Sequence, residues 1–356
     1  MTVPQPDLIS VQPNGLFCES GGCFVDPWKP VDKAIITHAH SDHHCRGCGT
    51  YLCTPETAAA LRVRVGPDIR VQELTYGERV TVGDVHVSLH PAGHILGSAQ
   101  VRLEPVHGGP VWVITGDYKT VPDRVSGSFE SVPCDVFITE STFGLPVYRW
   151  PDQTAVAADI NAWWQENAEA GRTSLLIAYA LGKAQRVIAE LDPSIGPIGC
   201  HGSVQAMCDV YRNAGAALPP TVHANAESAP SLRGQGIVVA PGSVLETPWV
   251  RRFVGPNGIR RAMVSGWMMV RGRRRWRTVD RGFIMSDHAD WNGLIETIRA
   301  TGASRIGVTH GYTSVMSRYL EEQGFESCIV PTRFTGEQPI GAGAKSYDQV
   351  PAVDDS

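Results

Sequence analysis

The sequence predicts an α/β protein with two domains. Short apolar segments rich in β-branched residues alternate with longer amphipathic segments, which is the pattern of strands and helices that follow one another. The chain has 356 residues, more than one hydrophobic core usually organises, so two domains are expected. With 42% hydrophobic and 19% charged residues, 37 Gly and 25 Pro, the composition is that of a loop-rich globular enzyme and excludes a disordered or fibrous chain.

Most of the expected strands lead directly into a cluster of polar residues. They cover residues 34–37, 85–89, 111–115, 136–139, 174–178, 237–240 and 305–309. Amphipathic helices are expected over residues 153–170, 183–191, 204–213, 292–300 and 314–323. Residues 341–356 have the composition of a loose polar tail.

The net charge and the N-terminal segment limit which partners the protein can bind and where in the cell it is expected. The formal net charge is −5, so nucleic-acid binding requires a local basic patch. The N-terminus has no basic stretch followed by an apolar one, and no window of about 20 apolar residues occurs. We therefore expect a cytoplasmic protein that does not contact membranes.

The nine cysteines are an odd number in a chain without an export signal, which favours reduced thiols over a disulfide framework. Cys45, Cys48 and Cys53, with Cys18 and Cys23, could in principle form an additional thiolate zinc site. Structural zinc sites need two well-spaced pairs that converge. Buried free thiols are therefore the favoured interpretation.

The first candidate metal ligands follow the expected strand 34–37. His38 and His40 are two residues apart at a strand end and can face one ion, while Asp42 and His43 can reach a second ion nearby. His44 is expected to be a supporting or exposed residue. Two further candidates, His94 and Asp117, also follow expected strands, although each alone would be compatible with a simple turn.

The series His-x-His-x-Asp-His, Gly-His, Gly-Asp and a late histidine resembles the metallo-β-lactamase superfamily. The resemblance implies an αββα sandwich with two metals at the edge of its sheets. It implies one metal on His38, His40 and His94, a second on Asp42, His43 and His310, and a bridging Asp117. Asp26 matches the early aspartate that supports the ligand loop in this superfamily.

Almost two hundred residues separate Asp117 from His310, which leaves room for an inserted domain. The flanking motifs 139–144, 285–290 and 309–311, and the internal segments 178–186 and 240–243, resemble the β-CASP nucleases of this superfamily. The resemblance implies a first metallo-β-lactamase part over 1–149, an inserted β-CASP domain over 150–268, a return segment over 269–345 and a tail over 346–356.

The expected chemistry is phosphodiester hydrolysis with two divalent ions, zinc or manganese, that share an activated water. Asp42 and Asp117 count as catalytic because their carboxylates hold the metals. An alkoxide is a poor leaving group, so a proton donor is useful, and His288 oriented by Glu140 is the candidate general acid. A neutral core histidine is the competing interpretation of His288.

A basic cluster is the candidate nucleic-acid contact. Guanidinium groups suit phosphates and Trp276 can stack on a base, although a solvated charged surface explains the segment nearly as well. The arginines are Arg271, Arg273, Arg274, Arg275 and Arg277. Lys183 is a further candidate, because helix N-terminal amides there can receive a phosphate. A nucleotide P-loop is excluded, since Ile177 and Ala184 replace its required residues.

The whole pattern, with segments 24–28, 265–268 and 286–291, is similar to the bacterial ligase-associated DNA exonucleases. The resemblance implies DNA as the substrate, exonuclease activity, a role in DNA repair and functional association with a DNA ligase. An RNA-processing β-CASP ribonuclease is the main alternative, because a histidine at the position of His310 is commoner there. A thioester or lactam hydrolase and a catalytically silent scaffold are less favoured.

Overall fold

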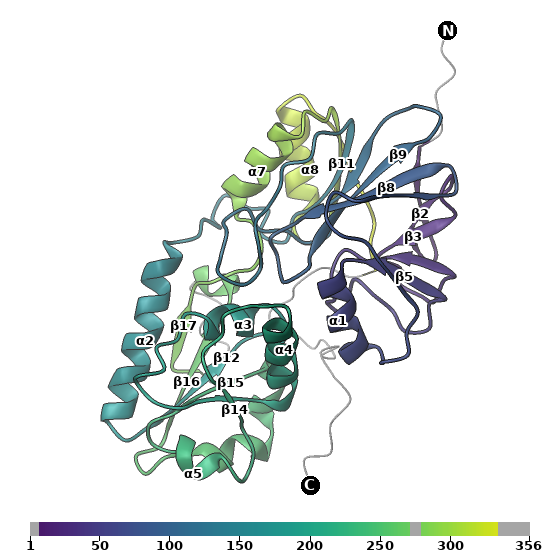
Figure 1. Cartoon of the computed structure of the whole chain (residues 1–356). Coiled ribbons are helices and arrows are strands. Elements are labelled where there is room, and N and C mark those ends of the chain that lie inside the picture. The colour runs from purple at the N-terminus through teal and green to yellow at the C-terminus, as the bar shows by residue number, and fades with distance from the viewer. Residues whose placement is uncertain (1–6, 271–278, 334–356) are drawn as a thin grey trace. The chain divides into compact units, whose positions relative to one another are not determined.

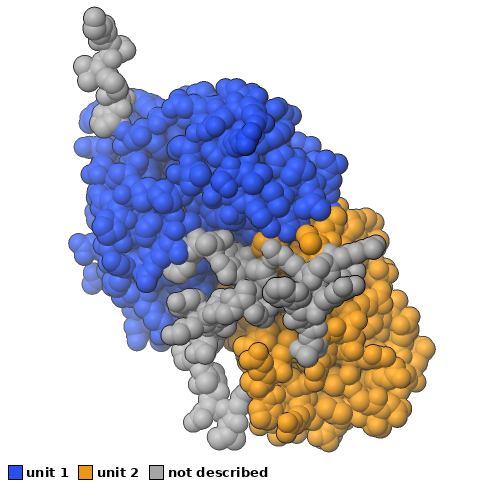
Figure 2. Space-filling model, turned by 180° about the vertical axis from the view of Figure 1, so that it is seen from behind, with its two compact units in different colours: residues 1–149, 288–337 blue, residues 150–287, 338–356 orange. Residues whose placement is uncertain are grey.

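The computed structural model describes residues 7–270 and 279–333 and divides the chain into two compact units (Figure 2). The first unit comprises the described residues of 1–149 and 288–337, and the second those of 150–287. The return to the first unit at His288 lies later than residue 269, where the sequence placed it. The reason is that β16 (Ile259–Val264) and β17 (Arg281–Phe283) pair in the sheet of the second unit.

The first unit contains two sheets. One has the strand order β1-β2-β3-β4-β5-β6 and the other β19-β18-β11-β10-β9-β8-β7. The first sheet is built from β1 (Ile9–Gln12), β2 (Gly15–Cys18), β3 (Cys23–Val25), β4 (Lys33–Ile35), β5 (Thr50–Cys53) and β6 (Val71–Glu73). The second is built from β7 (Arg79–Val82), β8 (Val85–Pro91), β9 (Ala99–Pro105), β10 (Trp112–Ile114), β11 (Val136–Glu140), β18 (Arg305–Thr309) and β19 (Glu326–Ile329).

The two sheets enclose one apolar core. Val25 and Ile35 of the first sheet belong to the same buried cluster as Val87, Val101 and Ile138 of the second. Because successive side chains of a strand point to opposite faces, each sheet keeps a second face for other elements. The first unit is therefore a sandwich of two sheets.

Helices cover the outer side of the second sheet. Two of them, α7 (Trp291–Ala300) and α8 (Thr313–Glu322), follow β17 and β18 in the chain (Figure 1). Leu294 and Met316 on these helices pack with Phe137 and Val308 of the sheet in a separate buried cluster. The helix α1 (Pro55–Arg64) follows β5, and Thr54 caps its N-terminus by accepting a hydrogen bond from the Thr57 backbone N–H.

The second unit has one sheet in the order β14-β13-β15-β12-β16-β17, and every strand pair in it is parallel. The remaining strands are β12 (Thr173–Ile177), β13 (Ile198–Cys200), β14 (Val222–His223) and β15 (Ile237–Ala240). The connecting helices are α2 (Gln153–Glu169), α3 (Lys183–Ile188), α4 (Gly202–Asn213), α5 (Ala229–Leu232), η1 (Gly242–Glu246), η2 (Pro248–Phe253) and η3 (Gly266–Met269). Trp164 and Leu176 lie in its core. The chain is thus an α/β protein.

None of the helices in the described part of the chain has the length and apolar character needed to cross a membrane. Residues 271–278 and 334–356, which include the basic cluster and the expected tail, lie outside the described residues.

Candidate metal centre

The candidate ligands meet at one edge of the first unit because they follow strands that end there. Since β10, β11 and β18 are parallel neighbours, the residues at their carboxyl ends share an edge. Asp117 follows β10, Glu140 is the last residue of β11, and His310 follows β18. Gly116 has a φ of +57°, and a Cβ there would overlap the side chain of Thr37. The glycine therefore allows the Asp117 loop to approach the histidine loop.

Three histidines and Asp117 form the first group of donors. Their ligand atoms lie within 4.8 Å of one another, and the residues are His38, His40, His94 and Asp117. The Nε2 of His94 is 3.1 Å from the Nδ1 of His40. The Oδ2 of Asp117 is 3.7 Å from the Nε2 of His38 and 3.8 Å from the Nε2 of His94.

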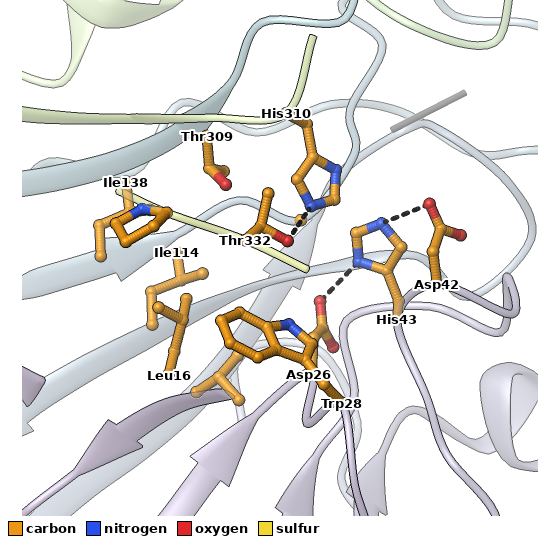
Figure 3. A pocket seen from close by; sticks show the side chains of 13 residues that line it. Leu16, Asp26, Trp28, Asp42, His43, Ile114, Ile138, Thr309, His310 and Thr332 are labelled. Carbon is orange, nitrogen blue, oxygen red and sulfur yellow. Dashed lines mark hydrogen bonds and ion pairs between the residues drawn. The ribbon is translucent and has the colours of Figure 1, made fainter. Parts of the chain in front are cut away.

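Asp42, His43 and His310 form a second group, also within 4.8 Å. Asp117 lies beside this group too, because its Oδ2 is 3.4 Å from His43 Nε2 and its Oδ1 is 3.7 Å from His310 Nδ1. Figure 3 shows His43 between Asp42 and Asp26, with His310 nearby. One buried carboxylate therefore faces donors of both groups, as a residue shared by two cations would.

Several of these atoms are buried without a hydrogen bond. They are the Nε2 of His38, the Nε2 of His43, the Oδ1 of Asp117 and the Nδ1 of His310. An unsatisfied buried polar atom costs about 1–3 kcal/mol, and four converging ones are not explained by packing. Imidazole nitrogens with one carboxylate are the donor set that zinc and related divalent cations prefer. The residues present thus fit a divalent metal centre.

Hydrogen bonds to the Asp26 carboxylate orient the imidazole of His43 directly and that of His38 through Thr37. The Oδ2 of Asp26 accepts from the Nδ1 of His43 at 2.7 Å and from the hydroxyl of Thr37 at 2.6 Å. The Thr37 hydroxyl in turn lies 3.1 Å from the Nδ1 of His38, which can donate to it. With both Nδ1 atoms turned toward these oxygens, Nε2 is the nitrogen of His38 and of His43 that faces Asp117 and is left for a cation. Asp26 thereby supports both groups.

The pKa values of His38 and Asp117 suit metal binding. Burial, followed by the neighbouring imidazoles, holds the pKa of His38 well below its ordinary value, so the ring is neutral. Burial alone raises the pKa of Asp117, but His43 and His288 outweigh burial and hold it well below its ordinary value. A neutral imidazole and an ionised carboxylate are the forms that bind cations.

His43 differs from His38. Burial lowers its pKa, but the carboxylates of Asp117, Asp42 and Asp26 outweigh burial and hold the pKa well above its ordinary value. Because a proton must leave Nε2 before that atom can bind a cation, cation binding at the second group would release a proton.

Glu140 and His288 form a buried pair beside the first group. The Nδ1 of His288 is 2.9 Å from both carboxylate oxygens of Glu140, and the backbone N–H of Tyr118 donates to Glu140 at 2.8 Å. The rings of His288 and His94 are 4.6 Å apart between centroids. Asp117, Glu140 and His288 also have ligand atoms within 4.8 Å. Glu140 therefore holds the imidazole of His288 against the donors.

Two other polar residues have different surroundings. Both ring nitrogens of His44 are buried without a hydrogen bond, and burial, followed by Arg64, lowers its pKa to about 3. His44 belongs to neither donor group.

Lys183, in the second unit, is 1% exposed. Its Nζ lies 3.9 Å from Asp287 and over the ring of Tyr179. The structure therefore buries this candidate phosphate contact beside Asp287 and Tyr179.

Some residues of the site carry no recognisable pattern in the sequence. Thr37 and Thr332 contact ligand histidines through their hydroxyls, and the Thr332 hydroxyl lies 3.4 Å from His310 Nε2. In the second unit, Arg186 at the end of segment 178–186 is buried and donates to the backbone of Ser286 and, at 3.3 Å, to Asp287. Residue type and position alone do not show which ligand a threonine hydroxyl will contact.

No protein-family model matches the chain. It is 33% identical over 319 residues to a probable DNA ligase of Opitutus terrae, covering 89% of this chain and 30% of that protein. It is 27% identical over 184 residues to an RNase J-like protein of Methanocaldococcus jannaschii, covering 45% of this chain and 43% of that protein. The chain thus spans less than half of the length of either relative.

A crystal structure of a protein of unknown function from Enterococcus faecalis V583 has a similar fold, with a TM-score of 0.56 and 12% sequence identity over 84% of this chain and 79% of that one. The order of the ligand motifs, their convergence on Asp117 and the relatives agree on one classification. The chain belongs to the β-CASP group of the metallo-β-lactamase superfamily.

Proposed function

We propose that the chain is a metal-dependent nuclease that hydrolyses phosphodiester bonds of DNA as an exonuclease with a role in DNA repair. The observation that carries the proposal is the pair of donor groups that face the two oxygens of the buried Asp117. In this proposal the first unit is the αββα sandwich of the superfamily, and the second unit is the inserted β-CASP domain.

The proposed cofactor is a pair of divalent ions, zinc or manganese. His38, His40 and His94 would hold one ion, and Asp42, His43 and His310 the other, with Asp117 shared. Such a pair supplies a nucleophilic water at neutral pH and neutralises charge on the phosphate. Asp26 and Thr37 keep the ligand nitrogens aimed at the site.

His288 is the proposed general acid. The two carboxylate oxygens of Glu140 lie on the Nδ1 side of the ring, so Nδ1–H donates to Glu140 and the opposite nitrogen can give a proton to the leaving oxygen. The negative charge of Glu140 stabilises the imidazolium that precedes this transfer. The Tyr118 N–H holds Glu140 in place through a separate hydrogen bond.

The choice of DNA rests on a relative that matches 89% of this chain and is named a probable DNA ligase. A functional association with a DNA ligase is part of the proposal. The second candidate is an RNA-processing ribonuclease, which is supported by the RNase J-like relative and by the histidine at position 310. A thioester or lactam hydrolase is less favoured, because it has no use for a second unit of this size.

The test is a cleavage assay with purified protein and 5′- or 3′-labelled single- and double-stranded DNA and RNA of one sequence, after chelation and with zinc or manganese added back. The proposal expects metal-dependent release of nucleotides from DNA ends. Asp117→Asn should abolish it. Asp135→Asn is the matched control, because the exposed Asp135 accepts a backbone hydrogen bond from Val111 away from the donors.

Cleavage of RNA alone would support the ribonuclease candidate. Failure to cut either polymer while the protein binds two metals would refute the nuclease proposal. Equal activity of wild type and Asp117→Asn would mean that the nuclease is a contaminant.

A further inference from the structure

Cys45 and Cys48 form a close thiol pair directly after the histidine loop. Their sulfur atoms are 3.4 Å apart, and both residues are half-buried. A disulfide needs a separation of about 2.05 Å, so closure requires the sulfurs to approach by only about 1.4 Å. The pair is therefore positioned for a bond without a large rearrangement of the chain.

Hydrogen bonds hold the turn that carries this pair. The hydroxyl of Tyr51 donates to the carbonyl of Cys45 at 2.7 Å and accepts from the backbone N–H of Cys48 at 3.2 Å. Arg46 donates to the carbonyl of Arg64 at 2.8 Å, which ties the turn to the end of α1. Gly47 has a φ of +84°, which a tight turn at this position requires. The two thiols are thus brought together by the folded chain.

The other close cysteines differ in their access to solvent. Cys18 and Cys23 face each other across β2 and β3, and both are essentially fully buried. Cys200 is also fully buried, beside Cys208. A small oxidant dissolved in water can reach Cys45 and Cys48, whereas the core protects the other two pairs.

A metal site on this turn has less support. Among residues 7–270 and 279–333, no group of three or more donor atoms within 4.8 Å contains a cysteine. A structural zinc ion takes four protein ligands, and two thiols alone do not supply them. Two adjacent thiols without further donors are the arrangement of a dithiol that can be oxidised.

We propose that Cys45 and Cys48 form a reversible disulfide in the folded protein when it meets a peroxide. The Cys48 sulfur attacks one peroxide oxygen, the O–O bond breaks, and a proton completes the departing water or alcohol. The resulting Cys48 sulfenic acid is attacked by the Cys45 sulfur, which breaks the S–O bond and releases water with the Cys45 proton. The two sulfurs lose two electrons and the peroxide gains them. A dithiol reductant reverses the reaction.

Cys48 is the better first nucleophile. The side-chain hydrogen bond from Cys45, followed by the backbone N–H of Val31 and the Tyr51 hydroxyl, lowers the pKa of Cys48 to about 6 despite burial. A thiolate reacts with peroxides whereas a thiol does not. Cys45, whose sulfur lies 3.4 Å from that of Cys48, then acts in the second step.

The experiment uses the full chain, whose cysteines are first reduced and from which the reductant is then removed. The protein is treated with hydrogen peroxide at a small molar excess, blocked with an alkylating reagent, digested with trypsin and analysed by mass spectrometry. Trypsin cuts after Arg46, so the disulfide joins residues 34–46 to residues 47–62. Because the second peptide also contains Cys53, fragmentation of the linked peptide identifies the bonded cysteine.

The proposal expects the Cys45–Cys48 linkage to appear and to disappear on treatment with dithiothreitol. Cys134 should remain alkylated, since it is also half-buried but burial raises its pKa to about 12. The proposal is overturned if Cys45 and Cys48 are alkylated as completely as Cys134, or if Cys48 bonds to Cys53 instead.

Two variants refine the test. In Cys45→Ser, Cys48 should persist as a sulfenic acid that dimedone captures, and in the matched control Cys134→Ser the linkage should form at the wild-type rate. If dimedone labels wild type and Cys45→Ser equally, Cys45 does not resolve the sulfenic acid and the proposal fails. Should Cys45→Ser not fold, the linkage in wild type still decides the question.

Discussion

Asp26→Asn is the substitution that most directly tests how the ligand loop is held. Asparagine keeps the size of the side chain and tolerates the φ of +45° at this position. The Asp26 carboxylate accepts hydrogen bonds from the Thr37 N–H at 2.8 Å, the Thr37 hydroxyl at 2.6 Å and the His43 Nδ1 at 2.7 Å. An amide has one oxygen acceptor and one nitrogen donor, so asparagine in the orientation that keeps the Thr37 N–H bond turns its NH2 group toward the Thr37 hydroxyl and the His43 Nδ1.

The loss of a partner that orients a ligand typically lowers metal affinity by about 10–100-fold, or about 1.4–2.7 kcal/mol. We expect a decrease of this size for the cation held by Asp42, His43 and His310, since His43 contacts Asp26 directly. The group of His38, His40 and His94 should be affected less, because His38 keeps the Thr37 hydroxyl as its neighbour. The measurement is an isothermal titration calorimetry experiment in which zinc or manganese is added to metal-free protein prepared with a chelator. The titration gives a separate affinity for each of the two sites.

The pH dependence of this effect follows from His43. Burial lowers the pKa of His43, and the carboxylates of Asp117, Asp42 and Asp26, in this order of size, raise it. Removing the charge of Asp26 therefore lowers the pKa of His43. In the variant, protons compete less with the cation for the Nε2 atom of His43. The loss of metal affinity relative to wild type should therefore be larger at pH 8 than at pH 6. Asp135→Asn serves as the control. A wild-type affinity at both sites of Asp26→Asn would refute the reasoning that this carboxylate positions the ligands.

The other predictions concern the general acid, the shared carboxylate, proton release and the buried lysine. His288→Ala should lower turnover by about 10²–10⁴-fold while elemental analysis still finds two metals; unchanged turnover would exclude its role. Asp117→Asn should lower the affinity of both sites in the same titration, and a loss at one site only would mean that the carboxylate is not shared. In wild type, affinity at the second site should rise with pH until the raised pKa of His43 is passed, and a flat profile would contradict this. Lys183→Met should destabilise the protein to denaturant by about 1–3 kcal/mol because Lys183 is buried beside Asp287; weaker binding of DNA at unchanged stability would instead favour a phosphate contact.

The ligand motifs are accessible from the sequence because they are local. His38, His40, Asp42 and His43 follow one strand, and short spacings carry strong geometric information. The strand expected at 34–37 is observed as β4 (Lys33–Ile35), one to two residues earlier. The pairing of β10, β11 and β18, which brings Asp117 to His310, depends on long-range contacts that periodicity does not encode.

The remaining elements were harder to predict for physical reasons. The strands β1 to β3 have only three or four residues each, which is too short for an alternating pattern to be recognised. The helix expected over 183–191 ends at Ile188, because local pattern does not determine where packing stops a helix. The sequence predicts that the second unit ends at residue 268, whereas the observed unit continues to Asp287, because three-residue β17 carries too little pattern to be recognised as a strand.

The order of the donors along the chain has a consequence for biosynthesis. His38, His40, His94 and Asp117 all precede the second unit, whereas His310 follows it. A ribosome must therefore translate residues 150–287 before the group of Asp42, His43 and His310 can be completed. A product truncated within that stretch keeps Asp42 and His43 but lacks His310, and with it β18 and β19 of the sheet that carries Asp117.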